Sequence, residues 1–421
     1  MTVQVESSEV LTANNANKMF RALSHRNFRV FWAGAFLSNI GTWMQTVAQG
    51  WLVLQLTNSP FWLGADAFMA TAPGLVLTLA GGVFADLIDR RRILLVTQIG
   101  AGLTALVLAI LIVTGVVQVW MILALSFVTG SCMSLAGPSY QAITIDLVGR
   151  EDLANAIALN STQFQLARVV GPTFAGIALK LLGLAGCFFI NAISYIAVII
   201  AIVKVRFDDV RTESNHTLKD KGALWRDLIG GFRYVRSRPR VSILLSISAM
   251  TSLFGAPYLS MLPLYARDIF HLGETGLALM MGTAGAGALT GALVLAYLGD
   301  FKRKGWSVLG GALLFALCLI GFAFSKQIAL SLGFLFAIGF AIVCSVAVIN
   351  TLLQQLVADQ MRGRVMSMFI LSFIGAMPFG NLLAGACSAR FGAPRTLATG
   401  GLIIALFITS ITIRFKRLRE L

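Results

Sequence analysis

Apolar residues along this chain fall into long runs that short polar turns interrupt. A helix needs about 20 apolar residues to cross a bilayer, and twelve runs meet that length. They lie at 29–55, 61–85, 93–115, 118–143, 153–182, 184–204, 242–269, 275–299, 306–325, 327–354, 363–389 and 394–414. One long polar segment separates the first six from the second six. The pattern predicts an all-α membrane protein with twelve transmembrane helices in two pseudo-symmetric six-helix bundles.

The polar segments between the runs predict the domain boundaries. We expect a cytoplasmic N-tail, an N-terminal bundle, a cytoplasmic linker, a C-terminal bundle and a basic C-tail, at 1–28, 29–204, 205–241, 242–414 and 415–421. Within the linker, Ala223–Val241 mixes apolar residues with regularly spaced arginines. Two interpretations remain open: an amphipathic helix on the inner leaflet, or a solvated basic tether.

Basic residues are unevenly divided between the two sides of the predicted bundles. If the N-terminus lies inside, 27 of the 33 Lys and Arg residues face the cytoplasm, five face outward and Arg168 lies within a span. Cytoplasmic loops of membrane proteins carry the excess of basic residues. We therefore expect an inner-membrane protein with both termini cytoplasmic. No apolar core precedes Phe28, so we expect the first span to act as an uncleaved anchor.

Composition narrows the class further. The chain is 57% hydrophobic and 12% charged, whereas soluble domains carry about 25% charge. The net charge of +15 resides in loops and tails, so it indicates membrane orientation rather than nucleic-acid binding. Histidines and cysteines show no metal-ligand spacing, and neither a phosphate-binding loop nor a hydrolase arrangement is present. We expect a protein that is not an enzyme and has no cofactor and no metal.

A charged turn recurs in each half. The first lies at 81–92 and packs glycines, aspartates and three consecutive arginines between two spans. Its counterpart lies at 296–305, and the segments 145–156 and 354–365 echo each other in the same way. Parallel halves related by an axis along the membrane normal are one recognised plan of transporters.

These residues resemble the major facilitator superfamily. In the first turn Gly82, Asp86, Arg90 and Arg91 match its loop motif, although Leu87 stands where a basic residue is usual. Three stretches resemble the branch of the enterobactin exporter and macrolide efflux proteins, at 39–45, 155–161 and 361–365. The resemblance covers nearly the whole chain. It implies alternating access by a monomer, and helices 1, 4, 7 and 10 around a central cavity.

The resemblance also implies gating residues. Asp86 would lie near the N-terminus of helix 11, beside Arg364, because the partial positive charge there attracts an acid. Asp300 would be its counterpart near helix 5. In helix 5, Gly171 and Pro172 are similar to an element associated with exporters of the superfamily, and a glycine-proline kink permits close sliding contact between helices. Ordinary packing is the alternative explanation of that element.

Two charged residues stand inside the predicted spans and clear of the helix ends, where charge is costly. Arg168 lies near mid-membrane in helix 5 and Asp66 lies in helix 2. We interpret Arg168 as facing the cavity, where it would attract an anionic or carbonyl-rich substrate, and both residues as candidates for proton coupling. The alternatives are that Arg168 braces the bundle and that Asp66 reaches interfacial water.

Helix 1 carries a polar stripe. Thr42, Gln45 and Gln49 share one helical face, and Asn39 flanks it. In lipid such a face must turn inward, so we expect these residues to line a cavity, with Tyr258 of helix 7 adding aromatic surface.

The sequence thus predicts a secondary active exporter of small amphiphilic compounds, either a siderophore or a hydrophobic drug, with proton antiport. Its expected partners are the substrate, protons and the lipid bilayer. The predicted helix 4 has no charge from Trp120 to Ile143, which argues against a familiar arginine-based proton relay. A lysophospholipid flippase and a non-transporting receptor of the same fold remain alternatives.

Overall fold

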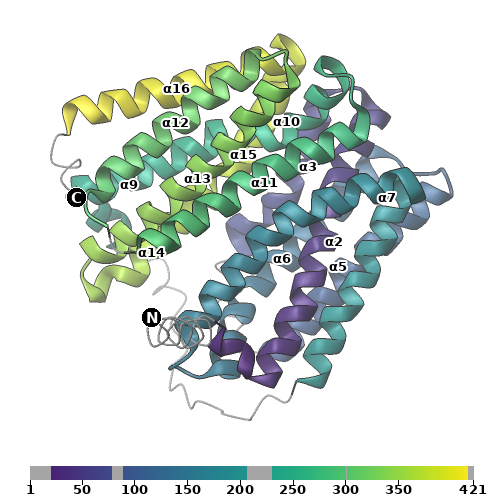
Figure 1. Ribbon diagram of the computed structural model, residues 1–421, viewed down its shortest axis with the longest axis horizontal. Helices are drawn as coiled ribbons and strands as arrows, with labels where there is room; N and C mark the ends of the chain where they lie inside the picture. The colour runs from purple at the N-terminus through teal and green to yellow at the C-terminus, as the bar shows by residue number, and fades with distance from the viewer. Residues whose placement is uncertain (1–19, 78–88, 206–229, 300, 416–421) are drawn as a thin grey trace, which may run out of the picture.

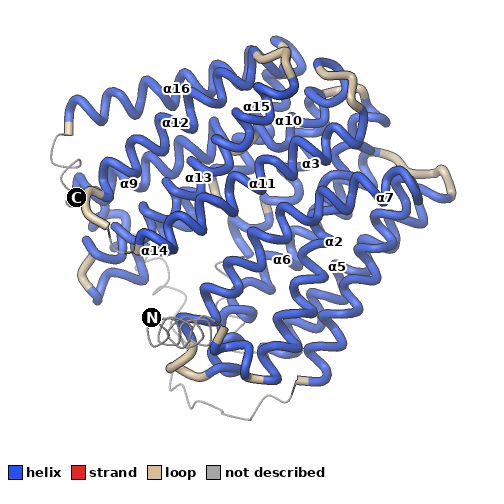
Figure 2. The backbone as a smooth tube through the Cα atoms, viewed as in Figure 1, coloured by secondary structure: helices blue, strands red, loops and turns tan. Residues whose placement is uncertain are grey.

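The computed structural model describes residues 20–77, 89–205, 230–299 and 301–415, and within them the ordered elements are helices joined by short loops (Figure 2). The N-terminal half holds η1 (Arg21–Ser24), α2 (Arg26–Thr57), α3 (Pro60–Thr71), α5 (Arg90–Val113), α6 (Val119–Val148) and α7 (Leu153–Lys204). The C-terminal half holds α9 (Pro239–Met250), η2 (Thr251–Gly255), α10 (Tyr258–Leu264), η3 (Tyr265–Ile269), α11 (Gly273–Leu298), α12 (Lys304–Phe324), α13 (Ile328–Leu356), α14 (Asp359–Ile374), α15 (Ala376–Phe391) and α16 (Ala393–Arg414).

These elements form twelve spans. Nine helical segments in the described ranges are long and apolar enough to cross a membrane. One of them, α7, contains two spans, because Gly183 adopts φ 67° and turns the chain between them. The spans that begin with α2 and α3 complete the set. The predicted all-α membrane fold with two bundles is therefore confirmed.

Spans are numbered helix 1 to helix 12 in chain order, which differs from the α labels. The seventh and eleventh spans, helix 7 and helix 11, are interrupted. Helix 7 runs from α9 through two π-helical turns, η2 and η3, and Pro257 lies just after the first of them. Proline has no N–H to donate, and π turns commonly mark such breaks. Helix 11 is divided at Gly375 into α14 and α15. The Ser252 hydroxyl donates to the Phe373 carbonyl at 2.5 Å, so the two broken helices are joined near their bends.

Because the number of spans is even, α2 begins and α16 ends on the same face, which we call the terminal face; the opposite face is the distal face. In Figure 1 the N-terminal half is purple to teal and the C-terminal half is green to yellow. The halves meet where α3 packs on α15, α7 packs on α11, and α10 packs on α2 and α3. Toward the terminal face the ribbons of α6 and α14 diverge (Figure 1).

Small residues permit this close meeting on the distal side. A Cβ on Gly64 of α3 would lie 2.8 Å from the Cα of Gly385 in α15, and a Cβ on Gly285 of α11 would overlap the Arg168 carbonyl of α7. Phe68 and Phe379 add an edge-to-face ring contact across the same seam, with centroids 6.2 Å apart. The packing that joins the halves thus extends from the distal face to about the level of Arg168.

Candidate functional site

A carboxylate is buried between three helices of the N-terminal half. Asp66 of α3 is 8% exposed, although it lies only six residues after Pro60 begins the helix. The side-chain amide of Gln49 in α2 donates to both of its oxygens at 2.9 Å, and the Ser126 hydroxyl of α6 donates to one of them at 2.5 Å. Asp66 therefore points into the bundle, and the interpretation that it reaches interfacial water is wrong.

The same amide also donates to Ser126 at 2.8 Å, which leaves that hydroxyl both accepting and donating. A serine hydroxyl rotates to suit its partners, and a protonated carboxyl gains one donor. If Asp66 takes up a proton, it can donate to Ser126 while Gln49 continues to donate. The arrangement can thus satisfy the carboxyl group in both of its protonation states.

A chain of amides continues from Asp66 through the polar stripe of helix 1. Gln45 donates to the Oε1 of Gln49 at 3.2 Å, and Asn191 of α7 donates to the Oε1 of Gln45 at 2.6 Å. Asn191 is buried, whereas Gln45 and Gln49 are half-buried. The predicted stripe on α2 (helix 1) therefore forms a network. It links α2 to α3 (helix 2), to α6 (helix 4) and to the second span of α7 (helix 6).

The other members of the stripe lie nearer the terminal face. Thr42 donates to the Ser38 carbonyl at 2.9 Å and lies 3.3 Å from the Tyr195 hydroxyl. Asn39, one residue away from that serine, is half-buried. These side chains share the inward face of α2 that the sequence predicts.

A second group forms around Arg168, at the level where the halves separate. Its guanidinium carbon lies 5.5 Å from the centre of the Trp43 ring, and it interacts electrostatically with the Tyr258 hydroxyl of the C-terminal half. That hydroxyl is buried, and no polar partner for it other than Arg168 lies in the described residues. Arg168 itself is half-buried. The structure thus brings two predicted cavity residues, Arg168 and Tyr258, together across the seam.

The glycine-proline element packs within its own half. A Cβ at Gly171 would overlap Trp43 of α2 and would lie 2.9 Å from the Ile40 carbonyl, so glycine permits α7 to approach α2. Pro172 follows it inside the helix and is likewise buried. In this structure the element holds Trp43 beneath Arg168.

A family model described as the transmembrane secretion effector matches residues 17–421. The chain belongs to this family, within the major facilitator superfamily. The predicted branch is confirmed, and the protein is a multi-pass membrane transporter.

The names of the transporter's relatives refer both to siderophores and to drugs. It is 24% identical to a staphyloferrin A transporter of Staphylococcus aureus, over 89% of this chain and 92% of that protein. It is 25% identical to a multidrug efflux pump of Mycolicibacterium fortuitum, over 92% and 95%. It is 22% identical to an enterobactin exporter of Shigella flexneri, over 94% of both chains.

Solved structures share its fold. A bacterial homologue of the human lysosomal transporter Spinster, in an inward-facing and unoccupied conformation, matches with a TM-score of 0.73 at 14% identity, over 94% of this chain and 98% of that one. A POT family transporter in complex with a thioalcohol-conjugated peptide matches with a TM-score of 0.72 at 12% identity, over 93% and 96%. Identities this low establish the fold alone.

The predicted gating residues are only partly visible in the transporter. Gly82, Asp86 and Asp300 lie outside the described residues. Arg90 donates to Asp146 at 3.1 Å, and Arg91 donates to the Val203 carbonyl at 2.8 Å, so both join α5 to neighbouring helices of the same half. The predicted latch from Asp86 to helix 11 stays a prediction.

The start of helix 5 has a partner that the sequence did not suggest. Asp152, at the N-cap of α7, pairs with Arg21 at 3.0 Å and with His25 at 2.9 Å. Asn155 accepts from the Ala22 N–H at 2.9 Å. The segment before α2 therefore docks at the start of helix 5, the place near which the resemblance puts Asp300.

Arg364 lies at the start of helix 11, as predicted, and faces the end of the linker. Residues 230–237 are helical, and a Cβ at Gly230 would lie 3.2 Å from the Arg364 guanidinium. Phe232 is exposed while Val235 is buried against the bundle. The membrane-surface placement of the linker stays a prediction.

Sequence reasoning missed Ser126 and Asn191. Both are uncharged polar residues in largely apolar spans, and other serines and threonines of these helices bond their own helix, as Ser131 and Ser134 do. Their usable signal is that each must find a partner in lipid. Only the packing of α6 and α7 on α2 shows that the partners are Asp66 and Gln45.

Proposed function

We propose that the transporter exports small amphiphilic compounds in exchange for protons, and that Asp66 carries the proton. The observation that supports this most strongly is that Asp66 is buried without a cation. In the described part of the chain, none of the ion pairs includes this carboxylate. An acid inside a bilayer costs about 2.5–3.5 kcal/mol even on lenient scales, and such residues mark proton pathways.

Alternating access would use this carboxyl group as follows. When the transporter is open to the distal side, Asp66 takes up a proton and stays bonded to Gln49 and Ser126. When it opens to the terminal side, the proton leaves Asp66, and substrate then binds for the outward step. The two protonation states favour different conformations, and this difference is what couples proton entry to substrate exit.

The substrate site we propose is the group of Arg168, Trp43 and Tyr258. No carboxylate pairs with Arg168 across the described ranges, so its charge is available for an acidic or carbonyl-rich compound. The Trp43 ring and the Tyr258 hydroxyl supply a flat surface and a hydrogen-bonding group. The relatives are named for siderophores and for drugs. Of these two substrate classes, a siderophore fits a cationic site better than a purely hydrophobic drug does.

The distribution of basic residues supports placing the terminal face in the cytoplasm, with the protein in the inner membrane. We further propose that it works as a monomer, since one chain supplies both halves of the site. Export follows from this orientation and from the exporters among its relatives.

The test uses proteoliposomes that hold a pH-sensitive dye. Catecholate and carboxylate siderophores, macrolides and lysolipids are added in turn, and proton movement is followed together with movement of the labelled compound. We expect siderophores to move protons through the wild-type protein. Asp66→Asn should abolish proton movement while substrate-for-substrate exchange continues, because the binding group around Arg168 is intact.

Asp359→Asn is the matched control, since Asp359 is an exposed acid in α14 whose side chain is 85% accessible. It should behave as wild type. Proton movement that survives Asp66→Asn would overturn the coupling role. Transport of lysolipids without proton movement would replace the exporter by the flippase, and binding without any transport would favour the receptor.

A further inference from the structure

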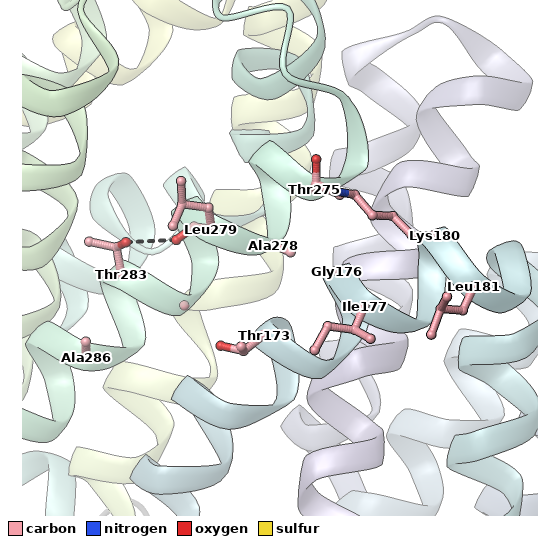
Figure 3. Close-up of a pocket in the computed structure, with 11 residues that line it drawn as sticks. Thr173, Gly176, Ile177, Lys180, Leu181, Thr275, Ala278, Leu279, Thr283 and Ala286 are labelled. Atoms are coloured by element: carbon pink, nitrogen blue, oxygen red, sulfur yellow. Dashed lines mark hydrogen bonds between the residues drawn. The ribbon is translucent and has the colours of Figure 1, made fainter.

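A groove runs along the seam between the two halves, on the side where α7 and α11 face the lipid. It has a volume of about 510 Å³, and Thr173, Ile177 and Lys180 form one wall while Thr275, Leu279 and Thr283 form the other (Figure 3). Ile177 is 52% exposed and Leu279 is 51% exposed. In a bilayer these side chains contact lipid rather than water, so the groove is open to the membrane.

Small residues form its floor. A Cβ on Gly176 would lie 3.2 Å from the Cβ of Ala278, so the two halves touch there. Gly282 is buried beside them, and a Cβ on it would meet Thr173 Oγ1 and the Val169 carbonyl at an ordinary 3.7 Å. The groove therefore has a closed floor of small residues, and its volume of about 510 Å³ lies above that floor.

The threonines do not make the groove polar. Thr173 donates to the Val169 carbonyl at 3.0 Å, and Thr283 donates to the Leu279 carbonyl at 2.8 Å, each within its own helix. With their hydroxyl groups already bonded, these residues contribute methyl groups to a largely apolar wall. Such a wall suits a hydrocarbon chain rather than a polar solute.

One charge lies at the distal end of the groove. Lys180 is exposed, and its amine lies next to Thr275 in Figure 3. It forms no ion pair within the described residues. Thus the groove is apolar along its length and cationic at the end nearest the distal face.

The length of the groove matches one leaflet. From Thr275 to Ala286 α11 advances about 16 Å at 1.5 Å per residue, which is about half of the 30 Å hydrocarbon thickness of a bilayer. The α7 wall runs antiparallel, so Lys180 lies at the headgroup level while Thr173 lies near the midplane. The dimensions and the charge together fit a single lipid of the distal leaflet.

We propose that this groove binds one anionic phospholipid, with its phosphate at Lys180 and one acyl chain along the seam. Because one wall belongs to α7 and the other to α11, the lipid contacts both halves at once. It would bind best while the distal side is closed, and it would be released as the walls separate. The site is distinct from the Asp66 network and does not depend on proton coupling.

Native mass spectrometry of the purified transporter tests this directly. Phosphatidylglycerol and phosphatidylcholine with the same acyl chains are titrated in parallel, with dodecyl phosphate and inorganic phosphate as single-chain and chain-free probes. We expect one phosphatidylglycerol to bind more tightly than phosphatidylcholine, weaker binding of dodecyl phosphate and none of inorganic phosphate. A phosphatidylglycerol with a photoreactive acyl chain should label the peptides that contain 173–181 and 275–286.

Two variants separate headgroup from chain. Lys180→Gln should weaken phosphatidylglycerol binding about fivefold, the factor that corresponds to about 1 kcal/mol per basic residue near a membrane surface, and should leave phosphatidylcholine unchanged. Gly282→Leu should fill the groove and abolish retention of both lipids. The controls are Lys326→Gln, an exposed lysine before α13, and Gly310→Leu in α12, where a Cβ would meet nothing within 4 Å.

Equal binding of both lipids that neither variant changes would overturn the proposal and leave only annular lipid. Displacement of phosphatidylglycerol by inorganic phosphate alone would also overturn it, because the acyl chain would then have no role. These experiments measure lipid binding, whereas the Asp66→Asn experiment measures proton transport. The lipid site and the proton-coupling role can therefore be refuted independently of each other.

Discussion

Arg267, at the distal end of helix 7, binds the last turn of helix 1 across the seam between the halves. Its guanidinium donates to the Asn58 side chain at 2.6 Å and to the Leu54 carbonyl at 3.4 Å, and its other nitrogens donate to Asp268. Asn58 ends α2 in the left-handed conformation at φ 49°. A cation at a helix C-terminus is favourable, so this contact holds the distal side closed.

Arg267→Gln should loosen that closure. The guanidinium is partly exposed, so the loss should be modest, about 1 kcal/mol, or roughly a fivefold shift toward the distal-open state. Distances between spin labels placed on the distal ends of helices 1 and 7 would measure the change. Arg395→Gln, which alters another basic residue on the distal face, is the control, and an equal shift in both variants would remove Arg267 as a specific clasp.

Gly64→Leu should also open the distal side, and more strongly, because a side chain cannot fit where α3 meets α15. Its Cβ alone would lie 2.8 Å from the Cα of Gly385. We expect the distal side to stay open and transport to fall at least tenfold, while the protein still inserts in the membrane. Labelling of a cysteine placed at Asn381 would report the opening. Gly333→Leu, where nothing lies within 4 Å, should leave labelling and transport unchanged.

Gln49→Leu should disable the Asp66 network without touching the acid itself. Ser126 would still donate to one carboxylate oxygen, but the other would lose its amide donor, and a buried acceptor left unsatisfied costs about 1–3 kcal/mol. We expect a lower melting temperature and at least a tenfold loss of proton-coupled transport. Adding Asp66→Asn should cause little further loss, since the two residues act as one unit. Fully additive losses would show that Gln49 acts separately.

Arg168→Ala should abolish uptake of an anionic substrate into inside-out vesicles and leave the fold intact. The cation that faces Trp43 and Tyr258 would be gone, while the backbone contact between α7 and Gly285 would remain. Arg168→Lys should retain part of the activity, because it keeps the charge. Quenching of Trp43 fluorescence measures substrate binding directly. It therefore distinguishes a loss of substrate affinity from a loss of the folded protein. Wild-type transport by the alanine variant would return Arg168 to a structural role.

Much of the membrane architecture follows from the sequence. The length of apolar runs determines the spans, because a helix must satisfy its own backbone in lipid, and Gly183 marks the turn between two spans that the chain joins without a polar loop. The polar stripe of helix 1 likewise predicted an inward face. Arg168 and Asp66 were recognisable because charge inside a span is rare.

Partnerships could not be predicted, because they depend on how helices that are distant in sequence rotate and pack against each other. The sequence placed Gln49 and Asp66 on separate helices and contained no signal that Ser126 would complete their site. It likewise contained no signal that Arg21 and His25 would pair with Asp152 at the start of helix 5. Periodicity sets which face of a helix is polar or apolar, a local property of the chain; only the tertiary structure decides which helix meets that face.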